Sequence, residues 1–309
     1  MSREENTYHP LFSILIANYN NGRYLQEAID SVLAQTYSNW QIILVDDGST
    51  DNSFEIYEKY KNDSRFHIYY NEENKGCGYT KHRCVDLADT ELCGFLDPDD
   101  KIHAITLERM VPECEKRPDC AVVYSSTYQW DDATGDVKVI ERVGAIDDDE
   151  DYLISLKKSV FHFAVIRKSF YNKTVGIDEN LRTGVDYDLY LKLEEVGKLH
   201  YVDIPLYYYR QNNPNSISGI SKKNNKTQLA ITHWEIALNA QIRRIASKNF
   251  LYVNNKPRYK NQMRWLLGRY KRLEGKVTRR MVKYFYWYLK ANGFSLKSFN
   301  HLRKIILTR

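Results

Sequence analysis

Four short apolar runs, separated by helical patterns, constrain the fold of this chain more than any other feature. The runs are Leu11–Ala17, Gln41–Val45, Phe66–Tyr70 and Leu92–Leu96. Each run has the length and composition of a buried strand, and patterns such as Leu25–Leu33 and Tyr79–Ala88 have apolar residues at helical spacing. Strands that alternate with helices over about a hundred residues predict an α/β fold with a mixed, mostly parallel, doubly wound sheet.

The fourth run ends abruptly in Asp97-Pro98-Asp99-Asp100. Pro98 fixes φ and lacks a backbone donor, so the strand must stop there and the acids lie at its carboxyl end. Open α/β sheets bind ligands at that edge. Neighbouring carboxylates repel one another unless a cation compensates them, and Mg²⁺ and Mn²⁺ prefer oxygen ligands. The motif therefore predicts a metal and phosphate site, with a solvated acidic turn as the alternative.

Three further polar segments follow strands and are expected at the same edge: Ala17–Asn21, Asp46–Asp51 and Asn71–Gly78. The chain has no P-loop, and Gly76-Cys77-Gly78 lacks the third glycine of a dinucleotide fingerprint. Phosphates would then be met by a metal and by side chains such as Lys81 and Arg83. A solvated helix face is the alternative for both, and it is the preferred interpretation of Lys81.

The patterns beyond Asp100 predict further helices and strands. A helix is predicted over Ile102–Glu115, and strands over Cys120–Ser125, Phe161–Ile166 and Leu206–Arg210. A helix that opens at Val185 has Asp186 in its first turn, where the helix dipole favours a carboxylate even without a catalytic role. The acidic run Asp147–Asp151 is interpreted as a solvated loop or helix start rather than a second metal site.

The last part of the chain differs in charge and pattern. Residues 256–309 hold 16 Lys and Arg against one acid, a net charge of +15, whereas the whole chain carries +5 and the remainder therefore −10. Apolar and aromatic residues recur there at helical spacing, for example Met263, Leu266 and Tyr270. Basic, aromatic, amphipathic helices are typical of membrane-surface or nucleic-acid-binding segments, and a solvated basic face is the plain alternative. We expect residues 1–215 to form one domain and 216–309 a helical extension.

The five cysteines are odd in number and form no C-x-x-C pair, which argues against a disulfide framework or a zinc ribbon. No run approaches the roughly 18 apolar residues of a spanning helix, and the first ten residues are polar. The expected location is cytoplasmic, peripheral at the inner face of the cell membrane.

Six segments, taken in order, resemble the family 2 inverting glycosyltransferases, which have the GT-A fold. They are Phe12–Asn20, Gln35–Tyr37, Val45–Asp51, Asn74–Gly76, Phe95–Asp100 and Gly184–Leu189, and the resemblance extends over about two thirds of the chain, Leu11–Arg210. It implies a nucleotide-binding half at about 11–125 and an acceptor half at about 126–215. It also implies a nucleotide-sugar donor, most commonly a UDP-sugar, a divalent metal (Mn²⁺ or Mg²⁺) at the D-x-D motif, and inversion at the anomeric carbon.

The resemblance assigns nucleotide binding to five residues outside the D-x-D motif. Tyr19 and Asp47 would bind the base, Ala17 would contribute backbone, and Asp46 belongs to the same loop. Arg83 matches a position that is usually basic and supports the diphosphate. The residue after this arginine is commonly Asn, and here it is cysteine.

The remaining implied roles concern the reaction itself. Asp97 would lie near the ribose or sugar of the donor, Asp99 would be the principal metal ligand with Asp100 beside it, and Asp186 would be the catalytic base. The family commonly has Glu before this base, where the present chain has valine, and Asp188 is therefore a rival base.

The leading hypothesis is a hexosyltransferase that adds a sugar to a hydroxyl of a glycan or lipid-linked acceptor in surface polysaccharide synthesis. The basic segment 256–309 would meet an anionic membrane surface. A metal-dependent nucleotidyltransferase is an alternative, but Asn18–Gly22 offers little of the glycine- and lysine-rich loop that this class needs. A nucleic-acid-binding protein is a second alternative, which leaves Asp97–Asp100 unexplained, and no nucleic acid is expected as a partner.

Overall fold

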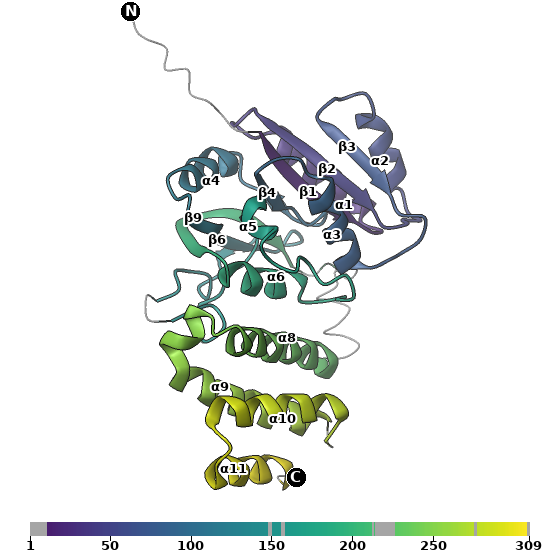
Figure 1. Cartoon of the computed structure of the whole chain (residues 1–309). Helices are drawn as coiled ribbons and strands as arrows, with labels where there is room; N and C mark the ends of the chain where they lie inside the picture. Colours follow the sequence, from purple (N-terminus) through teal and green to yellow (C-terminus); the bar gives the residue numbers. More distant parts are fainter. Residues whose placement is uncertain are drawn as a thin grey trace, which may run out of the picture.

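The computed structural model describes residues 11–147, 150–155, 158–211, 213, 226–274 and 277–307, which form a mixed sheet with flanking helices and then a stack of helices (Figure 1). The strands are β1 (Phe12–Asn18), β2 (Trp40–Asp46), β3 (Phe66–Tyr70), β4 (Leu92–Phe95), β5 (Lys101–Ile102), β6 (Cys120–Trp130), β7 (Val137–Val139), β8 (Ala164–Arg167) and β9 (Lys198–Arg210). The helices are α1 (Gly22–Leu33), α2 (Ser53–Tyr60), α3 (Cys77–Leu87), α4 (Thr106–Glu115), α5 (Lys168–Tyr171), α6 (Val185–Glu194), α8 (Lys226–Ala246), α9 (Phe250–Glu274), α10 (Arg279–Asn292) and α11 (Leu296–Leu307).

The strand order is β3-β2-β1-β4-β8-β6-β9-β5, and β7 pairs with β6. β1 pairs in parallel with β2 and β4, and β2 pairs in parallel with β3. β8 runs antiparallel to both β4 and β6, whereas β9 is parallel to β6. The predicted α/β class with a mixed sheet is thus confirmed, and the carboxyl ends of β1, β2 and β4 share one edge.

Both faces of the sheet are covered by helices. Successive side chains of a strand point to opposite faces, so each strand contributes to two cores. On one face Ile14 and Ile16 of β1 belong to a core that includes residues of α1, α2 and α4. On the other face Leu15 belongs to a core that includes residues of α3 and α6. Burial on both faces explains why these strands are continuous apolar runs rather than alternating ones.

Several predicted boundaries are wrong where pairing with a distant strand decides the structure. The helix predicted over Ile102–Glu115 begins at Thr106, because Lys101 and Ile102 pair with β9 as β5. The strand predicted from Phe161 starts only at Ala164. The strands predicted over Cys120–Ser125 and Leu206–Arg210 are parts of the longer β6 and β9, which pair with each other along most of their length.

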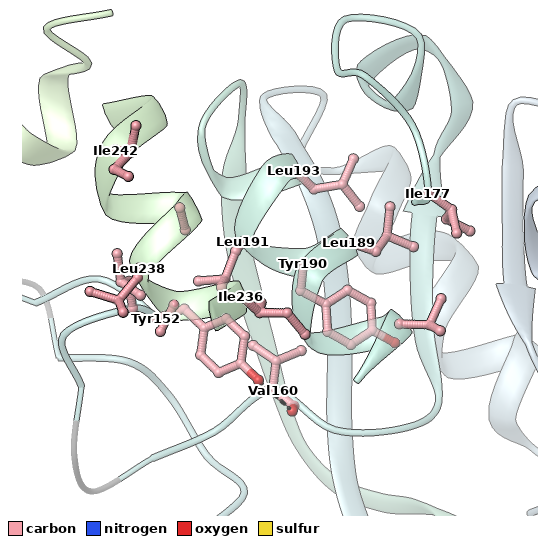
Figure 2. Close-up of a cluster of buried hydrophobic side chains, with 14 of the residues drawn as sticks. Tyr152, Val160, Ile177, Leu189, Tyr190, Leu191, Leu193, Ile236, Leu238 and Ile242 are labelled. Carbon is pink, nitrogen blue, oxygen red and sulfur yellow. Dashed lines mark hydrogen bonds between the residues drawn. The ribbon is translucent and has the colours of Figure 1, made fainter. Parts of the chain in front are cut away.

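The helices after the sheet continue the core rather than start a new one. Leu189, Leu191 and Leu193 of α6 lie in one cluster with Ile236 and Leu238 of α8 (Figure 2). The same core extends through α9 and α10 to α11. The expected domain boundary at 215/216 lies outside the described residues. None of the helices in the described parts of the chain combines the length and apolarity needed to cross a bilayer.

Candidate active site at the sheet edge

Two carboxylates from distant parts of the chain meet beyond the end of β4. Asp97 lies two residues beyond the end of β4, and Asp186 lies in the first turn of α6, after Gly184 with a φ of 70°. Lys81 of α3 joins them, with its Nζ 3.0 Å from Asp97 Oδ1 and 2.9 Å from Asp186 Oδ1. The two acids are about three-quarters buried, with 25% and 22% of their side chains exposed. The structure therefore brings together two predicted site residues and one that was not expected there.

Lys81 corrects the prediction of a solvated helix face. Its side chain is 5% exposed, and Nζ lies 5.0 Å from the centroid of the Phe95 ring. Burial alone would lower the pKa of Lys81, but the charges of Asp186 and Asp97 hold it well above its ordinary value. The missed signal is its position four residues after Cys77 and four before Val85, on the inward face of α3.

His162 lies against the same two acids and was not identified from the sequence. Its Nε2 is 3.7 Å from Asp97 Oδ2 and 3.8 Å from Asp186 Oδ2. The imidazole packs on Tyr207 and Tyr209 of β9, with centroids 5.7 and 6.5 Å away. Burial alone would raise the pKa of Asp97, but the charges of Lys81 and His162 leave it below its ordinary value. No local pattern around His162 marks it out, because its partners are far away in sequence.

Asp99 and Asp100 have different surroundings. Asp99 Oδ2 accepts a hydrogen bond from Asn213 Nδ2 at 2.7 Å, and burial followed by the charge of Asp97 raises the pKa of Asp99. Asp100 is fully buried, with Oδ2 accepting from the Tyr207 hydroxyl at 2.6 Å and Oδ1 from the backbone N–H of Arg210 at 2.7 Å. Both Asp100 oxygens are therefore engaged with β9, and the assignment of Asp100 beside the metal stays a prediction.

The surroundings of Asp99 fit a divalent cation. Asp99 is half-buried, and a raised pKa in a carboxylate with a second carboxylate nearby indicates negative charge that lacks full compensation, which a hard cation supplies. Within the described residues no group of three or more His, Cys, Asp and Glu side chains converges as a complete ligand set. Asp99, with Asp97 beside it, would thus offer only part of a coordination shell, and substrate phosphates and water commonly complete such shells.

Arg210 holds the Asp97–Asp100 loop in place through its guanidinium group. Its Nε donates to the carbonyl oxygen of Asp99 at 2.6 Å, and its guanidinium also pairs with Glu27 and Asp132. The group lies 4.5 Å from the Tyr24 ring centroid. Arginine suits this position because its planar fork can serve several oxygens at once.

Asp46 and Asp47 at the end of β2 hold neighbouring loops in place. Asp47 accepts from the backbone N–H groups of Lys75 and Gly76, both at 2.8 Å, and from Asn71 Nδ2 at 2.7 Å. Asp46 accepts from the Tyr57 hydroxyl at 2.5 Å and from the backbone of the loop that follows β2. Both carboxylates are buried, and their hydrogen bonds hold the loops after β2 and β3 together at this edge of the sheet.

Arg83 and the first loop complete this half of the site. Arg83 donates to the carbonyl oxygen of Tyr70 at 2.8 Å and to the side chain of Asn71, which in turn bonds Asp47. These contacts connect Arg83 to the loop after β3, whereas Lys81 is the basic residue beside Asp97. Ala17 lies near the end of β1, and Tyr19 presents a ring that is 45% exposed.

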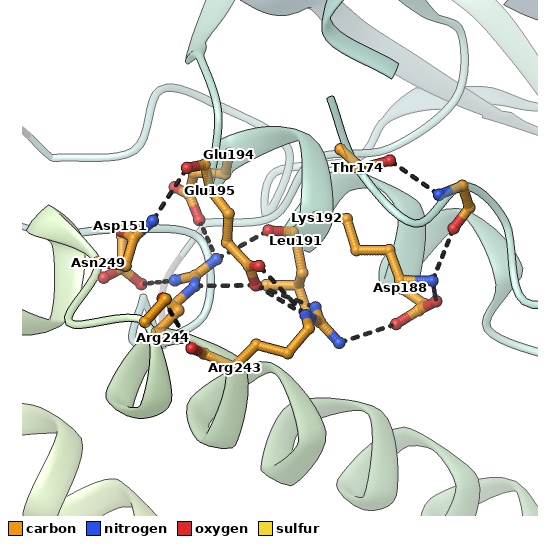
Figure 3. Close-up of polar contacts among 12 residues, drawn as sticks. Asp151, Thr174, Asp188, Leu191, Lys192, Glu194, Glu195, Arg243, Arg244 and Asn249 are labelled. Atoms are coloured by element: carbon orange, nitrogen blue, oxygen red, sulfur yellow. Dashed lines mark hydrogen bonds and ion pairs between the residues drawn. The ribbon is translucent and has the colours of Figure 1, made fainter. Parts of the chain in front are cut away.

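Asp188, the rival base, is engaged elsewhere. Its Oδ2 is 2.6 Å from Lys192 Nζ and its Oδ1 3.8 Å from Arg243 Nη1, and its side chain is 7% exposed (Figure 3). Asp186 is the acid of α6 that contacts Lys81 and lies beside Asp97. This arrangement favours Asp186 over Asp188.

A second ion-pair cluster fixes the far end of α6. The fully buried Arg244 of α8 donates to Asp151 at 3.1 Å, to Glu194 at 2.9 Å and to the carbonyl oxygen of Leu191 at 3.0 Å (Figure 3). Asp151 also accepts from the Tyr259 hydroxyl of α9 at 2.7 Å. The interpretation of Asp147–Asp151 as solvated is therefore wrong for Asp151, because its partner lies far along the chain. Residues 148 and 149 lie outside the described part.

The chain is similar in sequence to a family of known proteins. The model of glycosyl transferase family 2 matches residues 13–175, which include the loops after β1, β2 and β4. Chondroitin synthase of Escherichia coli is 31% identical over 202 residues, which are 63% of this chain and 28% of that protein. The chain thus spans less than a third of the length of this relative.

Solved structures with low identity share the fold. The Staphylococcus aureus protein TarS, residues 1–349, in complex with UDP-GlcNAc superposes with a TM-score of 0.56 at 17% identity, covering 95% of this chain and 90% of that one. A mannosyltransferase of Pyrobaculum calidifontis, in complex with GDP-Man and Mn²⁺, gives a TM-score of 0.59 at 15% identity, covering 96% and 80%.

Proposed function

Because the chain belongs to glycosyl transferase family 2, we propose that it moves a sugar from a nucleotide-sugar donor to a hydroxyl of a glycan or lipid-linked acceptor in surface polysaccharide synthesis, with inversion at the anomeric carbon. The observation that carries the proposal is the meeting of Asp97 and Asp186 around Lys81 at the carboxyl edge of the sheet. The naming of a relative as a chondroitin synthase supports a polysaccharide product.

Asp186 is the general base in this proposal. A sugar hydroxyl is a weak nucleophile, and a carboxylate that accepts its proton within about 2.6 to 3.2 Å makes the attack on the anomeric carbon feasible. Asp186 is partly exposed beside Asp97, so an acceptor hydroxyl can approach it, while Lys81 orients its other oxygen. Inversion requires one such base and no carboxylate nucleophile, unlike retaining hydrolysis.

The donor lies along the loops after β1, β2, β3 and β4. Tyr19 offers an exposed ring for stacking on the base, with Ala17 providing backbone contacts. The buried Asp46 and Asp47 position the base-binding loops, and Arg83 supports the nucleotide from the loop after β3. We propose a UDP-sugar as donor.

Asp99 is the residue that would hold a divalent cation, Mn²⁺ or Mg²⁺, with Asp97 beside it. When bound, such a cation supplies charge stabilisation for the departing nucleoside diphosphate. Asp100 keeps the loop in register with β9 through Tyr207 and Arg210. Lys81 adds a fixed positive charge next to Asp97, where the leaving group gains negative charge.

The basic C-terminal helices are proposed to attach the enzyme peripherally to the cytoplasmic face of the membrane, where lipid-linked acceptors are available. Residues 1–215 then form the catalytic domain, and 216–309 the extension that brings it to the surface. The support for this location is the +15 net charge of residues 256–309.

Calorimetric titration of UDP, GDP and CMP, each with and without Mn²⁺, tests the proposal. We expect one nucleotide to bind in a metal-dependent manner and this binding to disappear in Asp99→Ala, with Asp188→Asn as a control that keeps it. If no nucleotide binds under any metal condition, the glycosyltransferase proposal fails.

A further inference from the structure

The last helix, α11, exposes apolar side chains on the face that points away from the protein. Leu296, Phe299, Ile306 and Leu307 recur at helical spacing and are 79%, 50%, 39% and 65% exposed. Leu302 and Ile305 lie on the inward side and are buried. A surface helix whose inward side is already packed is expected to be polar outside, so these four apolar side chains, which share their side of the helix with Asn300 and Arg303, require an explanation.

The apolar surface continues into the turn before α11 and onto α10. Phe294 in the turn is 62% exposed and lies 6.4 Å, centroid to centroid, from Tyr286 of α10, which is 50% exposed. Val282, one turn before Tyr286, is exposed as well. We call Val282, Tyr286, Phe294, Leu296 and Phe299 the apolar ridge. Figure 1 shows α11 at the end of the helix stack farthest from the sheet.

A cationic groove runs beside this ridge, between α9 and α11. It comprises an open surface depression of about 400 Å³ and an adjoining one of about 170 Å³. Its basic lining consists of Arg264, Arg272, His301 and Lys304, with Trp265 at one side. Gly268 lies in the groove, and a Cβ atom added there would meet no heavy atom of another residue within 4 Å.

The positive potential of the groove acts on His301. Loss of hydration, together with the charges of Arg264, Lys297 and Lys304, lowers the pKa of His301. Lys297, His301 and Lys304 recur on the flank of α11 between its buried and its outward apolar sides. One helix therefore presents an apolar face and a cationic flank next to each other, the pattern of helices that lie in a membrane interface.

We propose that this end of the molecule docks on an anionic lipid leaflet, with the apolar ridge at the headgroup–acyl boundary and the groove between α9 and α11 holding lipid phosphate groups. The proposal deepens the peripheral attachment stated above and rests on it. Charge complementarity supports an anionic partner, and the exposed apolar ridge supports a lipid surface. A soluble phosphate or a nucleic acid would use the cations alone and leave the ridge in water.

Flotation of the full chain with vesicles tests the proposal. We expect binding to vesicles of phosphatidylcholine with 30 mol% phosphatidylglycerol, weak binding to pure phosphatidylcholine, and weakening at high salt. Arg264→Gln with Arg272→Gln should reduce the affinity about 30-fold, since each cation near an anionic leaflet contributes about 1 kcal/mol. Lys138→Gln with Lys173→Gln, which removes two exposed charges from the sheet region, is the matched control and should change it little.

Two further variants separate charge from apolar contact. Gly268→Glu places a carboxylate in the groove without removing a cation and should weaken binding at least tenfold, whereas Gly268→Ala should keep it. Leu296→Ser with Phe299→Ser should weaken binding to anionic vesicles although every charge remains.

Several outcomes would overturn the docking proposal. They are equal binding to neutral vesicles, equal losses in the groove variant and its control, binding of inorganic pyrophosphate or RNA to the groove without vesicle binding, and a dimer in light scattering whose formation is abolished by the ridge variant. Nucleotide titration of the same variants distinguishes the two proposals. Normal nucleotide binding without vesicle binding refutes docking and the peripheral attachment but leaves the proposed sugar transfer standing, whereas absent nucleotide binding in the unmodified chain refutes the proposed transferase.

Discussion

The two ends of α6 carry similar ion pairs in very different surroundings. At its start Lys81 lies between Asp97 and Asp186, whose side chains are about a quarter exposed. At its far end Arg244 lies between Asp151 and Glu194, and both Arg244 and Asp151 are fully buried. Partners in the first cluster can be exchanged for substrate groups, whereas those in the second cannot meet water or ligand. In the proposed function the first cluster serves the reaction, and the second fixes the helix that carries the proposed base.

The largest expected effect is on the first cluster, Lys81 with Asp97 and Asp186, which we call the open cluster. Asp186→Asn should lower the turnover number by about 10² to 10⁴-fold, because it removes the proposed general base while keeping the shape of the side chain. Nucleotide affinity, measured by calorimetry, should stay within about threefold of the unmodified value, since the substitution leaves the base-binding loops intact. Asp188→Asn is the control. If it abolished activity while Asp186→Asn did not, the base would be Asp188.

We call the second cluster, Arg244 with Asp151 and Glu194, the closed cluster. Arg244→Met should lower the free energy of unfolding by about 3 to 5 kcal/mol, because Asp151 and Glu194 would be left buried without their cation. Urea denaturation followed by circular dichroism measures this change. Arg243→Gln, at a partly exposed neighbour, should cost less than about 1 kcal/mol. Similar costs for the two variants would mean that burial does not distinguish Arg244.

Replacement of Lys81 tests whether the open cluster depends on its cation. Lys81→Met leaves Asp97 and Asp186 without the ammonium between them, and the turnover number should fall about 10²-fold through the loss of one fixed charge at the site. Lys81→Arg, which keeps the charge, should recover part of the loss. Unchanged turnover in Lys81→Met would show that the pair is structural only.

The last effect, a gradual one, concerns pH. Burial raises the pKa of Glu194 to about 7 in spite of the charge of Arg244, so the folded state binds this proton more tightly than the unfolded state. The free energy of unfolding should therefore fall as pH rises from about 4.5 to about 7, by at most about 1.4 kcal/mol per pH unit from this group. Denaturation of the unmodified chain and of Glu194→Gln across this range should show the contribution as a difference in slope, and parallel curves would contradict it.

The sequence allowed good predictions where the signal is local. Apolar runs between helical patterns identified β1 to β4, and Pro98 located the end of β4 before the acids. Asp186 could be placed in the first turn of a helix from its neighbours alone. These features depend on residues within one or two turns of each other.

Predictions failed where a residue depends on partners that are distant in sequence. Lys81 and Asp151 were both assigned to solvent because charged residues usually lie there. Each is buried because an opposite charge reaches it from another element, Asp186 in one case and Arg244 in the other. His162 had no local pattern at all, and its position beside Asp97 follows from the pairing of β8 with β4.

The continuous core from the sheet through α6 into α8 has a consequence for synthesis of the protein on the ribosome. The chain emerges from its amino end, so α6 and Asp186 are made before Ile236, Leu238 and Arg244, which cover and fix that helix. Until α8 follows, Glu194 lacks its cation Arg244, and the side of α6 that packs on α8 is uncovered. The nascent chain would therefore hold the proposed base in place only after α8 has emerged, which is just before the basic segment 256–309 is made.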